Sequence, residues 1–377
     1  MTLKINNSVL FPYSKKTETL FHPKATMDRK NGIVVMTVQT IGGSDYYGPI
    51  QVCYSNDKCI SWTYPEMIPS LGWHEIGNGM IEGVCDVVPD YHSGTGKVLT
   101  VGHNVYYKDG KFCDTLGAFT PEDKSSLPRY SVYSVLDSDG VWSPRRRIHF
   151  EEFEKCSAFV CGCAQKVFLP DGKIVIPFVI GYESRRDCSV CSLLCEFDGQ
   201  TITPLKRGNM LENPVDRGLL EPSLIEFENK YYMTIRAEDG CGYVAESNDG
   251  LNWGQIKAWQ WKNGKPLCMS TTQQHWLVLG GRLYLVYTRK TELNTGVVRW
   301  RSPMFIAEVD TGKLCLKYET EQTVFPMCGD IANPKTVPLM GNFMPLALSE
   351  TEAIITDGDI LPFIDYSGNV LMVRLQV

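Results

Sequence analysis

Arginine and carboxylate side chains that follow short apolar runs are the residues of this sequence best suited to chemistry. Arg236 ends the run YYMTIR, where an unpaired guanidinium would be unfavourable and a bidentate pair with a carboxylate would be strong. Arg299 and Arg301 are separated by one residue, so on a strand they would share a face. We expect these arginines to bind an anionic substrate. The alternative is an internal brace in which a neighbouring acid neutralises Arg236: Glu221, Glu238 or Asp239.

Proton transfer would need an acid or a histidine. Asp45 follows a Gly-Gly-Ser loop after the run VVMTVQTI, a position that suits either a general acid at the rim of a cavity or the cap of an Asx turn. Histidine changes charge near neutral pH, so His92 and His103 are candidates, together with Asp86, which follows an apolar run ending in cysteine. The alternative for each histidine is a packed structural role.

Amide side chains form a third group. The stretch STTQQHWL places Gln273, Gln274 and His275 directly before an apolar strand. These groups could bind sugar hydroxyls inside a cavity, with His275 available for proton transfer, or they could form a hydrogen-bonded linker between two units of the fold. Gln39, in the strand before Asp45, and Glu238, after Arg236, are further candidates for substrate binding.

The overall charge excludes several classes of partner. The 377 residues include 37 basic and 43 acidic side chains, for a net charge of −6, which predicts no binding to nucleic acid or an anionic membrane surface. No window reaches the roughly eighteen apolar residues of a membrane span, and the segment MTLKINNSVLFPYSKK lacks the pattern of a signal peptide. We expect a cytoplasmic protein if the chain is complete, and a secreted or periplasmic one if a leader was removed.

The cysteines indicate reduced, packed thiols. Several of the fourteen lie in apolar runs, among them Cys53, Cys85 and Cys161, where a thiol packs as a small hydrophobe. Cys188 and Cys191 form a CxxC, but no second pair stands at the spacing of a zinc finger. The sequence therefore predicts no disulfide framework, no metal site and no cofactor.

Short β-rich runs bounded by turn residues make up most of the chain. The runs are rich in Val, Ile, Tyr and Thr, and turns with Asn, Asp or Gly introduce many of them: GIVVMTVQTI, KVLTVGHNVYY, KIVIPFVIGY, KYYMTIRA, RLYLVYTRK and NVLMVRLQV. Helical periodicity is not evident. The pattern predicts an all-β protein built from consecutive antiparallel hairpins.

One type of turn recurs in related forms along the chain. It reads YSNDKCISW at its first occurrence and ESNDGLNW at a later one. There are six such turns. The first interval is about 80 residues, which leaves room for an inserted loop in KFCDTLGAFTPEDKSSLPR, and the later turns follow one another at roughly 54 to 59 residues. The spacing predicts a six-bladed β-propeller with four-stranded antiparallel blades, forming one domain over residues 1–377 and closed by the N- and C-terminal strands. We expect the turn to be structural, its aspartate accepting backbone N–H bonds and its tryptophan packing between blades.

The stretch EPSLIEFENKYYMTIRAEDGCGYVAESNDGLNW, from Glu221 to Trp253, resembles the sialidase superfamily of six-bladed propellers with BNR repeats, or Asp boxes. The resemblance implies that Glu221 activates the catalytic nucleophile and that Arg236 belongs to a triad of arginines that binds the substrate carboxylate. It also implies that Asp45 is the acid/base. Candidates for another arginine of the triad come from the following unit: Arg289, Arg299 and Arg301.

The sequence departs from the sialidase pattern at two places. His-Pro-Lys, from His22 to Lys24, replaces the Arg-Ile-Pro element, and GNFMPLALSETEAIITDGD lacks a tyrosine at the place of the nucleophile. Attack by water, with inversion, is therefore the expected mechanism.

The resemblance implies an exo-acting glycoside hydrolase that cleaves a terminal acidic sugar, sialic acid or a related one, from glycans. A first alternative is a propeller polysaccharide lyase acting on uronates, for which His92, His103, Tyr130 and Arg146 occur in a loosely similar order. A second alternative is a non-catalytic propeller that binds carbohydrate.

Overall fold

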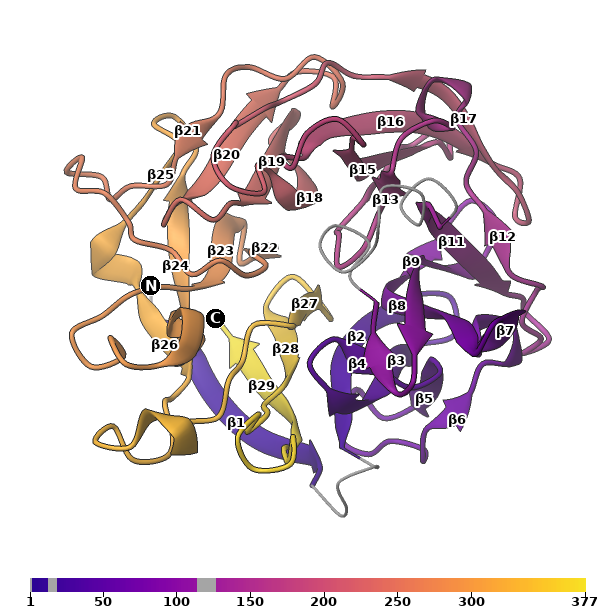
Figure 1. The fold of residues 1–377 in the computed structure, drawn as a ribbon. Coiled ribbons are helices and arrows are strands. Elements are labelled where there is room, and N and C mark those ends of the chain that lie inside the picture. Colours follow the sequence, from indigo (N-terminus) through magenta and orange to yellow (C-terminus); the bar gives the residue numbers. More distant parts are fainter. Residues whose placement is uncertain (1, 13–18, 114–126) are drawn as a thin grey trace.

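The computed structural model describes residues 2–12, 19–113 and 127–377, and regular structure within them is almost entirely β. Figure 1 shows the sheets arranged in a ring, and the chain is an all-β propeller with antiparallel blades. Most of the predicted inserted loop lies outside the described residues. No helix within the described ranges is both long and apolar enough to cross a membrane.

Three of the sheets have a simple antiparallel order. The first has the order β2-β3-β5-β6, with β4 beside β3: β2 (Leu20–Asp28), β3 (Ile33–Gly43), β4 (Tyr46–Tyr47), β5 (Gln51–Ser55) and β6 (Glu66–Met67). The next has the order β18-β19-β20-β21: β18 (Leu220–Phe227), β19 (Lys230–Arg236), β20 (Gly242–Ser247) and β21 (Lys257–Ala258). The third has the order β22-β23-β24-β25, with β26 beside β24: β22 (His275–Leu279), β23 (Arg282–Thr288), β24 (Met304–Asp310), β25 (Cys315–Leu316) and β26 (Gln322–Phe325).

The largest sheet has eleven strands, and its main path runs β17-β16-β15-β13-β11-β9-β8-β7. Its members are β7 (His74–Gly77), β8 (Met80–His92), β9 (Lys97–Lys108), β10 (Lys111–Phe112), β11 (Arg129–Leu136), β12 (Arg146–Arg147), β13 (Ala158–Val160), β14 (Val167–Phe168), β15 (Ile174–Gly181), β16 (Ser189–Phe197) and β17 (Ile202–Arg207). The short strand β13 pairs in parallel with β11 and antiparallel with β15, which joins two sets of hairpins into one sheet. The described residues therefore form five hydrogen-bonded sheets, and the predicted count of six blades is not confirmed.

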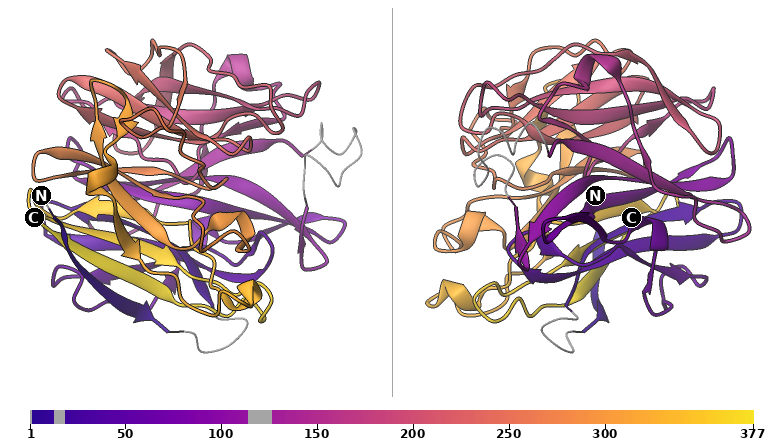
Figure 2. Two further views of the ribbon diagram at one scale, coloured as in Figure 1. Left: turned by 90° about the vertical axis from the view of Figure 1, so that its left-hand side faces the viewer. Right: turned by 45° about the vertical axis from the view of Figure 1, so that its right-hand side comes forward.

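The two ends of the chain share the remaining sheet, of order β1-β29-β28-β27. Its strands are β1 (Lys4–Phe11), β27 (Met344–Ala347), β28 (Glu352–Gly358) and β29 (Val370–Gln376). Lys4 pairs with Gln376, and Figures 1 and 2 show the termini close together. Short 3-10 helices lie in the connections: η2 (Pro69–Leu71), η3 (Glu151–Phe153), η4 (Val298–Trp300), η5 (Tyr318–Thr320) and η6 (Pro334–Thr336).

Apolar side chains hold neighbouring sheets together. One buried cluster combines Val286 and Ile306, from β23 and β24, with Ile355 and Val373, from β28 and β29. Each sheet thus buries its faces against the next, which explains why the β-branched runs in the sequence are nearly continuous.

The recurring turn is built as the sequence predicts. The Asp249 Oδ1 atom accepts hydrogen bonds from the hydroxyl of Ser247 at 3.0 Å and from the backbone N–H groups of Leu251 and Asn252 at 2.9 and 2.7 Å. Trp253 is buried and donates its indole N–H to the hydroxyl of Ser192 on β16 at 2.8 Å. The turn therefore braces β20 against the neighbouring eleven-stranded sheet.

Asp249→Ala should lower the free energy of unfolding by about 1–2 kcal/mol, because it removes the acceptor of these bonds. Burial alone would raise the pKa of Asp249, but the hydrogen bonds from Asn252, Leu251 and Ser247 hold it at about 2, below the ordinary 3.8. A carboxylate with a depressed folded-state pKa stabilises the fold above its ordinary pKa and loses that effect as the pH falls. Urea unfolding should thus show the difference between the two proteins shrinking from pH 3.8 toward pH 2.

Asp139→Ala, at an exposed position of another turn, is the matched control and should be close to neutral. Equal losses in the two variants would contradict the bracing role of Asp249.

Candidate functional site

A cavity of about 610 Å³ lies where the five sheets converge, lined by residues on or beside strands of every one. Its charged side chains come from segments far apart in the sequence. They are Asp45, Asp86, Arg129, Arg217, Glu221, Arg236, Arg299 and Arg301. A polar cavity of this size fits a small, charged ligand such as a sugar acid.

Three polar side chains reach the cavity through the same backbone irregularity. In β2, β8 and β18 the pairing register shifts, and at each shift a non-glycine residue has a left-handed φ: His22 (54°), Asp86 (57°) and Glu221 (44°). A bulge re-aims a side chain that would otherwise point into the space between sheets. Left-handed non-glycine residues are uncommon and concentrate at functional sites. Because the same backbone irregularity occurs in three strands that line one cavity, we identify this cavity as the candidate site.

The pair formed by Arg236 and Glu221 occupies one wall. Arg236 is buried, and its Nη1 atom lies 2.5 Å from Glu221 Oε1 while its Nε atom donates to the hydroxyl of Thr271 at 3.1 Å. The second oxygen of Glu221, Oε2, is buried without a hydrogen-bond partner among the described residues. Arg236 thus braces Glu221 and lines the cavity at once.

Arg299 and Arg301 form a cationic wall next to Arg236. Burial, together with the charges of Arg236 and Arg299, lowers the pKa of Arg301 to about 10. Burial also lowers the pKa of Arg299, helped by the charges of Arg236 and Arg217. Within the described residues neither Arg299 nor Arg301 has a carboxylate in salt-bridge range, and the Nε atom of Arg301 is buried without a hydrogen bond. An anion bound here would relieve this repulsion.

Asp45 and two tyrosines also line the cavity. Asp45 is exposed, has a left-handed φ of 52°, and accepts a hydrogen bond from the Tyr47 hydroxyl at 3.1 Å. Burial and the charge of Asp45 hold the pKa of Tyr47 well above 10 and also raise that of Tyr366. Tyr366 lies in the connection between β28 and β29 and lines the cavity. Sequence reasoning missed it, because its segment, DYSGN, had the form of a repeat turn.

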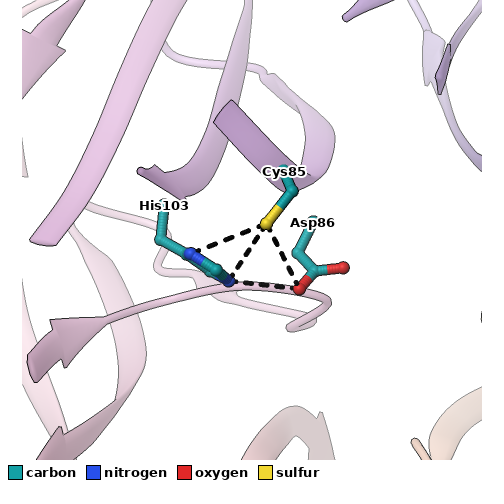
Figure 3. A group of neighbouring side chains, drawn as sticks. All are labelled: Cys85, Asp86 and His103. Atoms are coloured by element: carbon teal, nitrogen blue, oxygen red, sulfur yellow. Dashed lines mark hydrogen bonds and ion pairs between the residues drawn. The ribbon is translucent and has the colours of Figure 1, made fainter. Parts of the chain in front are cut away.

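Histidine and cysteine side chains surround Asp86 (Figure 3). His103 Nε2 lies 3.1 Å from Asp86 Oδ2, and the Cys163 thiol donates to Oδ1 at 2.9 Å. Burial alone would raise the pKa of Asp86, but the bond from His103 and the field of His22 hold it well below its ordinary value. Burial lowers the pKa of His22 to about 4, so this imidazole is neutral at pH 7. Cys85, Asp86 and His103 are close enough together to hold a metal ion.

Several residues predicted as site residues do not line the cavity: Gln39, His92, Glu238, Gln274, His275 and Arg289. Arg289 forms a bidentate pair with Glu321, at 2.7 and 2.6 Å, and its guanidinium lies over Phe305. His92 bonds the hydroxyl of Thr95 and the carbonyl of Gly172, both at 2.9 Å. Arg289 and His92 thus have polar partners inside the fold, so we do not retain them as substrate-binding residues.

The amides and the remaining acid have similar internal partners. Gln39 donates to the carbonyl of Val84 at 2.9 Å, and Gln274 Oε1 accepts the hydroxyl of Thr234 at 2.5 Å. Glu238 forms an ion pair with Arg217, a cavity residue that the sequence analysis did not single out. Glu238 therefore acts on the cavity through Arg217 instead of facing it.

A buried lysine ties the cavity wall together. Lys24 is fully buried, and its ammonium donates to Gln273 Oε1 at 2.9 Å and to the carbonyls of Asn342 and Phe343 at 2.9 and 2.8 Å. His275 Nε2 lies 3.2 Å from the same Gln273 oxygen. Burial and the nearby Lys24 charge hold the pKa of His275 well below 6.5, so this imidazole is a neutral structural group. The network joins three sheets at the axis.

Lys24→Met should destabilise the protein by about 3 kcal/mol, since it removes the ammonium donor from the buried carbonyls of Asn342 and Phe343 and one of the two donors near Gln273 Oε1. The loss should appear in urea unfolding, while Lys30→Met, at an exposed position, should change little. A Lys24→Met protein as stable as the wild type would show that the network is dispensable.

Comparisons with known proteins support the fold. No protein-family model matches this sequence, and no curated protein is similar to it at the sequence level. Among solved structures, a protein of unknown function from Dyadobacter fermentans is similar with a TM-score of 0.66 and 15% identity, over 99% of each chain. A Trypanosoma rangeli sialidase has a TM-score of 0.66 and 15% identity, over 98% of this chain and 59% of its own. A Hadza microbial sialidase has a TM-score of 0.67 and 12% identity, over 98% of this chain and 68% of its own. The chain therefore has a β-propeller fold of the sialidase type.

Proposed function

We propose that this protein is a glycoside hydrolase that removes a terminal acidic sugar from a glycan. The observation that carries the proposal is the cavity itself, where Arg299 and Arg301, without carboxylate partners among the described residues, lie beside Arg236 and Glu221. The carboxylate of a sugar acid has the charge and the geometry to bind paired guanidiniums. The similarity to sialidases, one of which was solved in complex with sialic acid, supports this substrate class.

The carboxylates have separate roles in this proposal. Asp45, at the exposed rim, protonates the leaving-group oxygen. Glu221, which Arg236 holds through Oε1, accepts a proton from the attacking water. Because the partner of Glu221 is an arginine and not a tyrosine hydroxyl, we propose attack by water with inversion of the anomeric centre. In this proposal the eleven-stranded sheet counts as two blades, which makes six around one active site in a single domain.

Hydrolysis should be measured with fluorogenic glycosides of sialic and uronic acids, with neutral glycosides as the comparison. We expect turnover of an acidic substrate, and Asp45→Asn or Glu221→Gln should lower kcat about 10²–10⁴-fold. Asp139→Asn, at an exposed turn, is the control. Turnover of neutral sugars alone, or full activity in both carboxylate variants, would reject the proposal; NMR of the first-formed anomer tests inversion.

Arg301→Met should raise KM for the acidic substrate about 10- to 100-fold, the loss expected for one charge-assisted contact. The value of kcat should change less than KM, because a contact made equally in the ground and transition states affects only substrate binding. Arg186→Met, which removes an exposed arginine outside the cavity, should leave KM unchanged. An unchanged KM in Arg301→Met would mean that this wall does not bind the anion.

Elimination by a polysaccharide lyase is the second candidate reaction. The residues that could carry it differ from those that the sequence suggested. Of His92, His103, Tyr130 and Arg146, only His103 lines the cavity. However, His22 and Tyr47 both line the cavity, and their ring centroids are 4.6 Å apart. In a lyase the neutral His22 would be the base and the Tyr47 hydroxyl the acid. Ultraviolet absorption by an unsaturated product from uronate polymers would identify a lyase. Saturable sugar binding without turnover would identify a binding protein.

A further inference from the structure

We propose that Cys85, Asp86 and His103 form a binding site for a divalent transition-metal ion of the zinc class, with His22 beside Asp86 as the partner of a water bound to the ion. The three side chains lie at the cavity wall, and Cys85 and His103 are buried (Figure 3). The inference does not depend on the reaction proposed above, since metal binding is measured without substrate.

The distances between the donor atoms match those around a tetrahedral zinc ion. With a Zn–S distance of about 2.3 Å and Zn–N and Zn–O distances of about 2.0–2.1 Å, donor atoms are roughly 3.3–3.6 Å apart. Cys85 Sγ lies 3.6 Å from His103 Nε2, which lies 3.1 Å from Asp86 Oδ2. The remaining edge, between Cys85 Sγ and Asp86 Oδ2, is 3.9 Å. Shifts of a few tenths of an ångström would place one ion in contact with all three.

The second nitrogen of His103 has the partner expected of a metal ligand. His103 Nδ1 lies 2.8 Å from the backbone carbonyl of Asn104. A histidine that binds a metal usually donates its other ring N–H to a carbonyl or a carboxylate, which fixes the tautomer. With Nδ1–H on that carbonyl, the lone pair of Nε2 is free to meet an ion beside Asp86. Cys85 Sγ lies 3.6 Å from Nε2 and 3.7 Å from Nδ1, so a rotation of the imidazole ring would accompany binding.

His22 supplies the independent observation. Its ring is buried, and neither Nδ1 nor Nε2 has a hydrogen-bond partner among the described residues. Nδ1 lies 3.3 Å from Asp86 Oδ1, so the ring adjoins the carboxylate of the proposed site but is not in the group of donors that lie within 4.8 Å of one another. A buried polar group without a partner is costly. A water held between His22 and the ion would provide that partner.

The donor set selects the class of ion. A thiolate with an imidazole favours zinc, cobalt or a similar transition metal, whereas Ca²⁺ and Mg²⁺ prefer oxygen donors throughout. On binding, the Cys85 thiol loses its proton to solvent and the sulfur–metal bond replaces the S–H bond. The CxxC at Cys188 and Cys191, the only motif that the sequence analysis tested as a metal site, is not part of this group.

The positive charge of Arg129 should weaken metal binding at this site. Its Nη2 atom lies 2.8 Å from His103 Nδ1 and 3.1 Å from Nε2, so the guanidinium competes with the metal for the imidazole and repels it by charge. Removing that cation should therefore strengthen binding. A purely structural cluster would give no such gain.

The experiment measures binding of Zn²⁺ and Co²⁺ to the full chain. We expect about one Zn²⁺ per chain by elemental analysis, and a Co²⁺ complex with the absorption of tetrahedral cobalt and a thiolate-to-cobalt charge-transfer band. Cys85→Ser should abolish that band, and His103→Gln should weaken Co²⁺ binding at least tenfold. Cys328→Ser, which removes an exposed cysteine elsewhere, should change neither, and circular dichroism checks the fold of each variant.

Arg129→Gln should bind Co²⁺ more tightly than the wild type, and His22→Gln more weakly. Wild-type protein that binds no Co²⁺, or a charge-transfer band that survives Cys85→Ser, would overturn the proposal. The wild-type spectrum decides the matter even if a variant fails to fold.

Discussion

The candidate site depends on a local break in the pairing of innermost strands. A regular strand directs its side chains alternately to its two faces, and in this propeller both faces pack against neighbouring sheets. Three residues do not follow this alternation: His22, Asp86 and Glu221. Each lies at a register shift and has a left-handed φ, so its side chain lines the cavity. Such a conformation costs about 1–3 kcal/mol per residue and persists only where surrounding contacts fix it. Arg236 fixes Glu221 in this way, and His103 fixes Asp86.

The cavity has two electrostatic regions as a consequence. One region is cationic, since Arg299 and Arg301 share it with Arg236 and lack carboxylates of their own among the described residues. In the other, the carboxylate of Asp86 lies among imidazoles and thiols. An acidic ligand suits the first region and a cation suits the second. One cavity could hold both, as opposite charges in a low-dielectric site attract more strongly than in water.

The stability of the ring arises elsewhere. The apolar cluster around Val286 and Ile355 and the turn around Asp249 hold neighbouring sheets together through residues that do not line the cavity. Other contacts between sheets lie at the cavity wall: the apolar cluster that includes Phe21 and Leu339, and the buried ammonium of Lys24, which joins residues of three sheets. This separation lets cavity residues change chemistry without loss of the fold, which fits a propeller similar to sialidases at only 12–15% identity.

The sequence by itself determined the all-β class, the hairpin pattern and the bracing turn, because each depends on neighbours a few residues apart: β-branched runs, Asn-Gly turns, and the spacing from Asp249 to Trp253. It also indicated Arg236, Glu221 and Asp45, whose placement in one cavity agrees with the resemblance that suggested them. Only the tertiary structure decided which polar residues face the axis. Arg289 has the same local sequence pattern as Arg236, yet it pairs with Glu321 outside the cavity. Tyr366 lines the cavity, although it belongs to a turn for which the sequence predicted a structural role. The physical reason is that a side chain's partner, and its exposure to the cavity, depend on which sheets become neighbours, and no local pattern encodes that.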